Sequence, residues 1–169
     1  MKSELAIRRT PTLADIPRVR EIMKSSGFFD RVFDEYDCAE EELRGAIDGS
    51  GEIFIFAELD GRVVGFASYE REACCESLYY LDWIAVDNTV RGHGIGRRLV
   101  EAILADVAER GATKLLLQTS GREQYLPTRK FYEKLGFVKE AEISDYYSPG
   151  ESSIFYGRGV KTPLKLHGA

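Results

Sequence analysis

Hydrophobic and polar residues recur along the chain with the periods of strands and helices. A period of two, or a short apolar run, predicts strands over residues 4–9, 53–59, 62–69, 78–86, 114–119, 137–147 and 152–159. An apolar stripe with a spacing of three or four predicts helices over residues 12–25, 40–48, 95–110 and 127–135. The pattern therefore predicts one succession of mixed elements, without an internal linker or repeat.

Local signals mark several element boundaries. Asp60-Gly61 joins two β-rich runs and predicts a tight hairpin, and Pro149-Gly150 predicts a second one. Thr12 and Asp15 have the spacing of a capping box. Gly111 ends the helix 95–110 as a C-terminal cap would. The fold class expected from this order is mixed α/β, with a largely antiparallel sheet and one parallel crossover through the helix 95–110.

Length and composition are those of one globular domain. The chain has 169 residues, of which 44% are hydrophobic and 30% charged, enough to bury a core without metal or disulfide staples. We expect a single domain over residues 1–169, with its core at about 4–159. The tail 160–169 has no periodicity, so we expect it to be disordered or to form an oligomer contact, with a homodimer as the candidate assembly.

Charge and cysteine content argue against several classes of protein. The formal net charge of −5 argues against a nucleic-acid partner, whose phosphates attract basic patches. No apolar run reaches membrane-spanning length, and the first residues lack a signal-peptide profile, so we expect no membrane partner. Cys38, Cys74 and Cys75 form an odd set that suits a reducing compartment, and we expect a cytoplasmic protein with no metal site.

The segment 81–99 carries the clearest chemical signal. A strand ends, a short turn follows, and Gly92, Gly94 and Gly96 lead into an amphipathic helix. Helix N-termini expose unpaired N–H groups, and glycines let the backbone approach phosphate oxygens, so the segment predicts an anion cradle. It lacks the Gly-Lys-Ser/Thr of a P-loop and the spacing of a dinucleotide-binding fingerprint. Taken alone, the glycines could also only shape a tight turn.

Two blocks resemble the GCN5-related N-acetyltransferase (GNAT) superfamily. Arg91-Gly92-His93-Gly94-Ile95-Gly96 is similar to the family's Arg/Gln-x-x-Gly-x-Gly/Ala signature, and it follows Ile84-Ala85-Val86, where the family has a coenzyme-contacting strand. The run 129–137 is similar to the family's later helix and turn. The resemblance covers residues 4–159 and implies a GNAT-like acyl-CoA N-acyltransferase fold. In that fold, helices cover both faces of the sheet, and strands 78–86 and 114–119 splay apart.

The resemblance implies acetyl-coenzyme A as the cosubstrate. The backbone amides that would hold its pyrophosphate belong to Arg91, Gly92, His93, Gly94, Ile95 and Gly96. The backbone of Ile84, Ala85 and Val86 would pair with the pantetheine arm as an added strand does. Many family members carry an asparagine after the fifth strand, and here Thr119 or Ser120 must take its place or the contact is absent.

Acetyl transfer to an amine needs a base for the ammonium and an acid for the departing thiolate. The resemblance makes Tyr132 the candidate acid, although it could instead be a core aromatic residue. Asp82 is the candidate base, since strand alternation places it on the face of Val86 unless a bulge intervenes, but it could also be an ordinary polar strand residue. His93 lies in the phosphate loop, where its amide should matter more than its ring.

Aromatic residues interleaved with carboxylates suit an amine acceptor. The candidate substrate residues are Phe28, Phe33, Tyr80 and Tyr147, with core packing as the alternative for these aromatics. The expected function is transfer of an acetyl group from acetyl-CoA to a primary amine of a small molecule or peptide. Two alternatives remain: a catalytically weak GNAT-fold module that binds coenzyme A as a sensor or scaffold, and an unrelated nucleotide-binding domain.

Overall fold

A computed structural model describes residues 4–29 and 35–160. By its internal contacts the chain falls into two compact units, one formed by Met1–Glu70 with Leu81–Ile103 and the other by Arg71–Tyr80 with Leu104–Ala169. Two strands and one helix have residues in both units. The expectation of a single domain stays a prediction.

Helices and strands follow the predicted order. The helices are α1 (Asp15–Ser26), α2 (Glu35–Ile47), α3 (Ile95–Glu109) and α4 (Leu126–Lys134), with 3-10 turns η1 (Asn88–Val90) and η2 (Glu123–Tyr125). The strands are β1 (Leu5–Arg8), β2 (Ile53–Leu59), β3 (Arg62–Arg71), β4 (Leu78–Val86), β5 (Lys114–Ser120), β6 (Val138–Ser148) and β7 (Glu151–Gly159). The largest departure is α2, which begins at Glu35 and not at Glu40. Glu35 and Asp37 lie in its first turn, where acidic side chains complement the helix dipole.

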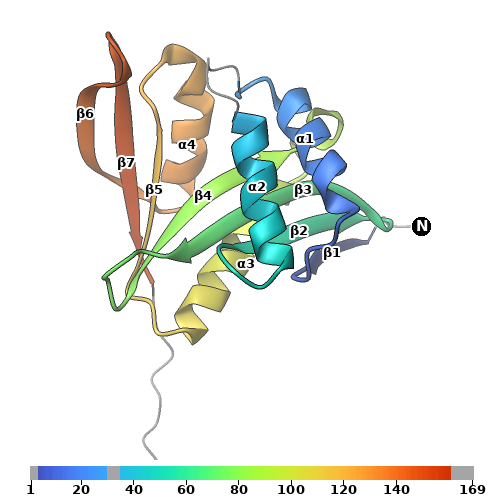
Figure 1. Cartoon of the computed structure of the whole chain (residues 1–169). Coiled ribbons are helices and arrows are strands. Elements are labelled where there is room, and N and C mark those ends of the chain that lie inside the picture. Colours follow the sequence, from blue (N-terminus) through green and yellow to red (C-terminus); the bar gives the residue numbers. More distant parts are fainter. Residues whose placement is uncertain (1–3, 30–34, 161–169) are drawn as a thin grey trace, which may run out of the picture. The chain divides into compact units, whose positions relative to one another are not determined.

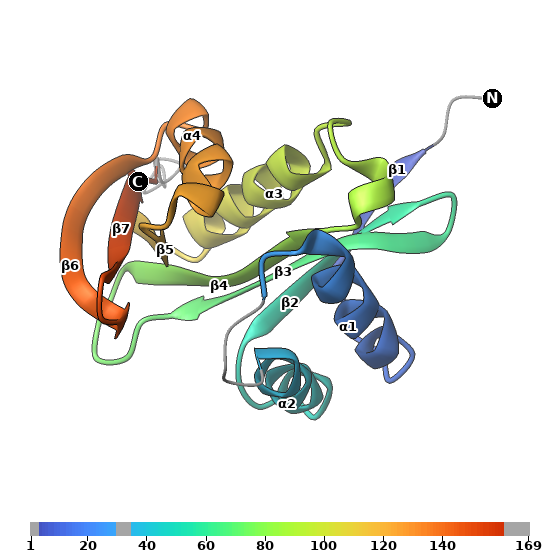
Figure 2. The same cartoon turned by 90° about the horizontal axis from the view of Figure 1, so that it is seen from above.

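The first unit is a helix-covered sheet. β1, β2 and β3 are antiparallel neighbours, with α1 and α2 on one face and the start of α3 on the other (Figures 1 and 2). Apolar side chains of α1 and α2 pack on Phe54, Phe56 and Phe66, whose rings are stacked at centroid distances of 6.3 Å. This burial supplies the main stabilisation of the unit.

The opposite face of the same strands packs closely on α3. A Cβ atom on Gly65 would lie 3.1 Å from the carbonyl oxygen of Ala85 and 3.3 Å from Ile95 Cγ2. Glycine at this position lets β3 approach both β4 and the first turn of α3. This contact fixes the start of α3 against the sheet.

The second unit contains the parallel crossover. Leu78, Tyr79 and Tyr80 at the start of β4 pair in parallel with residues 114–116 of β5, while β5–β7 and β7–β6 are antiparallel. The strand order is β1-β2-β3-β4-β5-β7-β6, so the mixed, largely antiparallel fold class is confirmed. The parallel ladder ends at Tyr80 and Leu116, although both strands continue.

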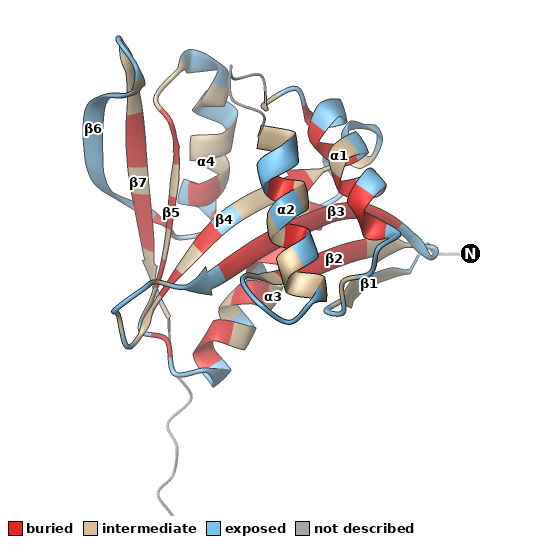
Figure 3. Ribbon diagram, viewed as in Figure 1, coloured by how far each residue is buried: buried red, intermediate tan, exposed pale blue. Residues whose placement is uncertain are grey.

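β6 is an exposed edge strand. Figure 3 shows it exposed along nearly its whole length, whereas its neighbour β7 is largely buried. Register shifts interrupt the β6–β7 ladder between Lys139 and Ala141 and again after Ile143. Within the described residues, no helix is long and apolar enough to cross a membrane.

Candidate coenzyme and acceptor site

The turn that follows β4 is held by a buried carboxylate. Asp87 caps η1, accepting hydrogen bonds from Thr89 N (3.0 Å) and Thr89 Oγ1 (2.8 Å), and it also pairs with the Arg18 guanidinium of α1. Its own N–H donates to Val64 O at 2.8 Å. Burial alone would raise the pKa of Asp87, but the bonds from Thr89 and Arg18 outweigh burial and lower it to about 2. Asp87 therefore stays ionised and anchors the turn.

The glycine-rich loop forms an open N-terminus for α3. Gly92 and Gly94 have φ angles of 81° and 75°, and a Cβ atom on either would meet no atom within 4 Å. Arg98 N donates to Gly94 O at 3.0 Å, so the amides of Ile95, Gly96 and Arg97 precede the first intrahelical donor. These N–H groups and the positive end of the helix dipole form a surface suited to an anion.

The side chains of Arg91 and His93 turn back onto the protein. Arg91 donates to Ser26 O at 2.7 Å, and its guanidinium lies 5.4 Å from the ring centroid of Phe28. His93 Nδ1 lies 3.2 Å from Val90 O and 3.0 Å from Arg91 O. The loop thus presents its backbone outward, while these two side chains hold its shape. Phe28, a predicted substrate residue, supports the loop through Arg91.

The predicted coenzyme strand, Ile84-Ala85-Val86, lies in the same unit as the loop. Ala85 is buried among the side chains of the α1–α2 core, and Ile84 and Val86 are half-buried. The strand leads through the Asp87 turn into the glycine loop. A cofactor with an extended, amide-bearing arm and a diphosphate would meet both features in order.

Asp82 lies in a cluster of carboxylates. One oxygen from each of Glu52, Glu70 and Asp82 lies within 4.8 Å of the other two. Glu42 of α2 adjoins this acidic cluster: it interacts with Glu52 and accepts a hydrogen bond from Trp83 Nε1. Asp82 and Trp83 are consecutive, yet both reach this cluster, so strict strand alternation does not describe β4 here.

The acidic cluster retains a proton near neutral pH. Burial, together with the negative charges of Glu42 and Glu70, raises the pKa of Glu52 to about 7, against the opposing effect of the Ser68 hydroxyl. Burial also raises the pKa of Glu42. Glu52 Oε2 is buried without a hydrogen-bond partner among the described residues. The cluster therefore concentrates carboxylates around Glu52.

Tyr132 belongs to the second unit and lies in an aromatic cluster. It is 4% exposed, and its ring centroid lies 5.3 to 6.4 Å from those of Phe131, Phe137 and Tyr156. Burial raises the pKa of its phenol, so the hydroxyl is protonated at neutral pH. That state suits a proton donor, and the packing also fits the alternative of a core aromatic residue.

Side-chain hydrogen bonds hold the end of β5 in place. Thr119 is buried and pairs with Ile154 of β7, while Ser120 Oγ donates to Glu151 Oε1 at 2.7 Å. Arg129 of α4 donates to the carbonyl oxygens of Ser120 and Arg122 at 2.8 and 2.9 Å. The predicted coenzyme contact of Thr119 would therefore come from a strand end that is already well ordered.

The predicted acceptor residues lie on different elements. Tyr80 lies on the ladder with β5, and Tyr147 stacks edge-on with Tyr146 at 4.9 Å on β6. Phe33 lies outside the described residues. Sequence reasoning missed Glu42, Glu52 and Glu70, whose only available signal was their placement at the ends of the predicted hairpin and on the second helix.

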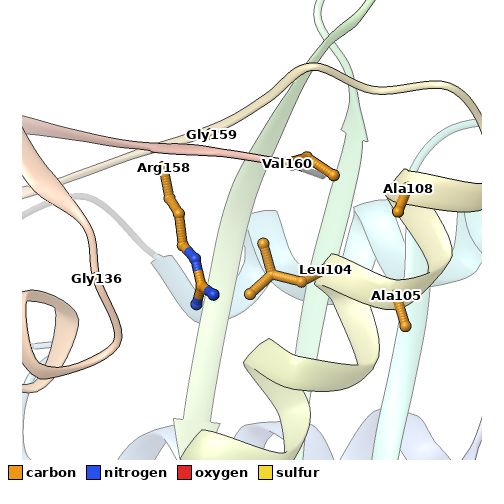
Figure 4. Close-up of a pocket in the computed structure, with 7 residues that line it drawn as sticks. All are labelled: Leu104, Ala105, Ala108, Gly136, Arg158, Gly159 and Val160. Atoms are coloured by element: carbon orange, nitrogen blue, oxygen red, sulfur yellow. The ribbon is translucent and has the colours of Figure 1, made fainter. Parts of the chain in front are cut away.

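A hollow of about 490 Å³ lies elsewhere in the second unit. Figure 4 shows Leu104, Ala105 and Ala108 of α3 on one side, with Arg158 reaching toward it from β7. Arg158 Nη1 donates to Leu135 O at 2.5 Å. This guanidinium is already used in joining β7 to the end of α4.

Comparison with known proteins identifies the family. Residues 16–137 match the acetyltransferase (GNAT) family. The chain belongs to the GNAT family. A crystal structure of a GNAT-family protein from Desulfovibrio desulfuricans is similar over 94% of this chain and 100% of that one, with 35% identity and a TM-score of 0.88. The resemblance inferred from the two sequence blocks is thereby confirmed.

Curated relatives of this GNAT chain differ in their acceptors. L-2,4-diaminobutyric acid acetyltransferase of Nocardia farcinica is 34% identical over 65% of this chain and 54% of its own length. N-alpha-acetyltransferase 30 of Schizosaccharomyces pombe is 31% identical over 46% of this chain and 50% of its own. The chain thus spans about half the length of these relatives. An aminoglycoside 6'-N-acetyltransferase complexed with coenzyme A shares the fold alone, at 17% identity and a TM-score of 0.75 over 95% of this chain and 99% of its own.

Proposed function

We propose that this GNAT protein transfers the acetyl group of acetyl-CoA to a primary amine of a small molecule or peptide. The observation that carries the proposal is the open glycine loop at the N-terminus of α3, directly after the β4 strand. This arrangement offers backbone donors to a diphosphate and an adjoining strand to an amide-bearing arm. Relatives named N-alpha-acetyltransferase 30 and L-2,4-diaminobutyric acid acetyltransferase support an amine acceptor.

The proposed coenzyme contacts come mainly from the backbone. Amides of the loop from Arg91 to Gly96 bind the diphosphate, and the strand Ile84–Val86 pairs with the pantetheine arm. The coenzyme supplies the activated acetyl thioester. The Val86 N–H is the proposed donor to the developing oxyanion, because fixed backbone donors stabilise such charge without reorganisation. Thr119 is the proposed substitute for the asparagine that many relatives carry.

Tyr132 is the proposed acid for the thiolate of coenzyme A. Burial raises its pKa and keeps its proton available. Asp82 as the base for the amine stays a prediction from the strand position.

Coenzyme binding tests the proposal first. We expect coenzyme A, but neither ATP nor NAD, to raise the melting temperature, since a ligand of the folded state stabilises it. Release of free thiol from acetyl-CoA in the presence of an amine panel then measures turnover. Stabilisation without turnover on any amine would favour the sensor or scaffold alternative.

A glycine pair provides a matched control for the loop. Gly94→Val should abolish stabilisation by coenzyme A, because the side chain would obstruct the approach of phosphate to the loop amides. Gly150→Val places the same side chain at a similar φ angle, 84° against 75°, in the β6–β7 turn. Both variants should lose comparable stability, but only Gly94→Val should lose the response to coenzyme A. Wild-type coenzyme affinity in Gly94→Val would refute the cradle.

A further inference from the structure

The acidic cluster beside the proposed coenzyme strand has the dimensions of an ammonium site. The oxygens of Glu52, Glu70 and Asp82 lie no more than 4.8 Å apart, so they fit within a circle of about 2.8 Å radius. That radius is the length of a charge-assisted N–H···O bond. A primary ammonium has three N–H donors. One such group can therefore donate to all three carboxylates at once.

A second observation points to a missing ligand. Ser68 is fully buried, and its hydroxyl oxygen has no hydrogen-bond partner among the described residues. The β2–β3 ladder pairs Phe54 with Ser68, so Glu52 and Glu70, two residues further out on each strand, share that face. Ser68 therefore lies on the side of the sheet that carries the cluster, close enough to Glu52 to lower the pKa of its carboxyl but outside hydrogen-bond geometry with it. Buried polar groups usually have partners, and a bound cation or its water would supply one.

The charges around the cluster favour a cation. The charged groups that act on Glu52 are Glu42 and Glu70, and those that act on Glu42 are Glu41 and Glu70. Two basic residues of α1 reach α2: Arg20 is paired with Asp37 and Glu40, and Lys24 lies over the ring of Tyr36. Since the acids repel one another, a ligand of opposite charge relieves repulsion as well as gaining its own contacts.

The ammonium held here is not the amine that reacts. Carboxylates around an amine favour its protonated form, and an ammonium has no lone pair with which to attack a thioester. The reacting nitrogen must lie further along β4, toward Ile84–Val86, where the proposed coenzyme arm runs. Asp82 precedes Ile84 by two residues, on the order of 7 Å along a strand, a gap that a short alkyl chain bridges.

We propose that the acidic cluster of Glu52, Glu70 and Asp82 binds a second, unreactive ammonium of the acceptor, so that the preferred acceptor is an aliphatic diamine. This inference rests on the proposed function. It changes the expected role of Asp82 from proton acceptor to recognition of charge. Glu42 of α2 accepts a hydrogen bond from Trp83 and interacts with Glu52.

A pair of acceptors that differ in one charge tests the inference. We expect kcat/KM for 1,4-diaminobutane to exceed that for n-butylamine at least about tenfold at pH 8. One hydrogen bond to a charged group contributes about that factor to binding. Glu70→Gln should remove most of this preference by lowering kcat/KM for 1,4-diaminobutane far more than kcat/KM for n-butylamine. The control Glu76→Gln removes an exposed acid outside the cluster and should keep the preference. Equal kcat/KM for the two amines, or a preference that survives in Glu70→Gln, overturns the inference but not the proposed function.

Two further readouts separate the remaining outcomes. Asp82→Asn should raise KM for the diamine alone; a fall in kcat for both amines would make Asp82 the base and remove it from the subsite.

If no amine is turned over, the proposed function fails, and melting temperatures then test whether the acidic cluster binds a diamine. The inference then predicts stabilisation of the wild type, and not of Glu70→Gln, by 1,4-diaminobutane. Stabilisation by MgCl₂ or CaCl₂ instead would show a metal site and overturn the inference.

Discussion

Replacing Glu52 by glutamine should stabilise the protein in alkaline solution. Glu52 faces Glu42 from α2, Glu70 from β3 and Asp82 from β4, together with the Ser68 hydroxyl. Burial and these negative charges raise the pKa of Glu52 from 4.5 to about 7 in the folded protein. Above pH 7 the folded state must therefore hold an unfavourable negative charge, which Glu52→Gln removes while keeping the shape of the side chain.

The magnitude follows from linkage. A rise from 4.5 to about 7 is worth up to about 3.4 kcal/mol at 1.36 kcal/mol per pH unit. Glu52 is only half-buried, so solvent screening reduces the expected gain to about 1–2 kcal/mol. The folded state binds more protons than the unfolded chain between pH 4.5 and 7, so stability falls as pH rises through this window. The variant should gain its full advantage above pH 7 and lose most of it by pH 5.

Urea unfolding at pH 5 and pH 8.5 measures this difference. Trp83 is the single tryptophan of the chain and lies against the acidic cluster, so its fluorescence reports unfolding directly. Glu76→Gln, which removes an exposed acid, should leave the free energy of unfolding unchanged at both pH values. A stability change in Glu52→Gln that is the same at pH 5 and pH 8.5 would show that Glu52 titrates normally and would refute the reasoning.

Three further substitutions test other parts of the structure. Leu43→Ala empties a fully buried position in the α1–α2 core and should lower the free energy of unfolding by about 2–5 kcal/mol; a loss below 1 kcal/mol in urea titration would contradict this packing. Tyr132→Phe should lower kcat and leave the Kd of coenzyme A unchanged, and undiminished kcat would eliminate the acid role. Asp87→Asn weakens the bonds to Arg18 and Thr89 and should cost on the order of 1–2 kcal/mol at pH 7. Because the pKa of Asp87 is lowered to about 2, that loss should shrink as pH falls below 4, and a constant difference would argue against an ionic anchor.

The glycine-rich loop at the start of α3 could be predicted from the sequence because its geometry is local. Gly92 and Gly94 needed φ angles near +80°, and the amphipathic stripe from Ile95 fixed where the helix starts. These features depend on neighbouring residues, so a contiguous motif contains them. The α2 start at Glu35 was missed because helix-favouring acids in a first turn resemble the polar residues of a loop.

The acidic cluster could not be predicted because it depends on a bulge. A regular hairpin closed by Asp60-Gly61 would place Glu52 opposite Tyr69. The register shifts at Ala57/Glu58, so that Ile53 pairs with Tyr69 and Glu52 falls opposite Glu70. One extra residue in a strand thus brings two carboxylates onto the same face. No pattern in the sequence predicts this bulge.

The exposed strand β6 also bears on how copies of the chain meet. An unpaired strand edge offers N–H and C=O groups to other molecules, and long regular edges promote fibrous aggregation. Here Lys139, Glu140 and Glu142 place charges along the edge, register shifts distort it, and Asp145 takes a positive φ of 53°. A second chain therefore finds no straight, uncharged template on which to extend the sheet, and the protein should tolerate crowding at high concentration without polymerising through β6.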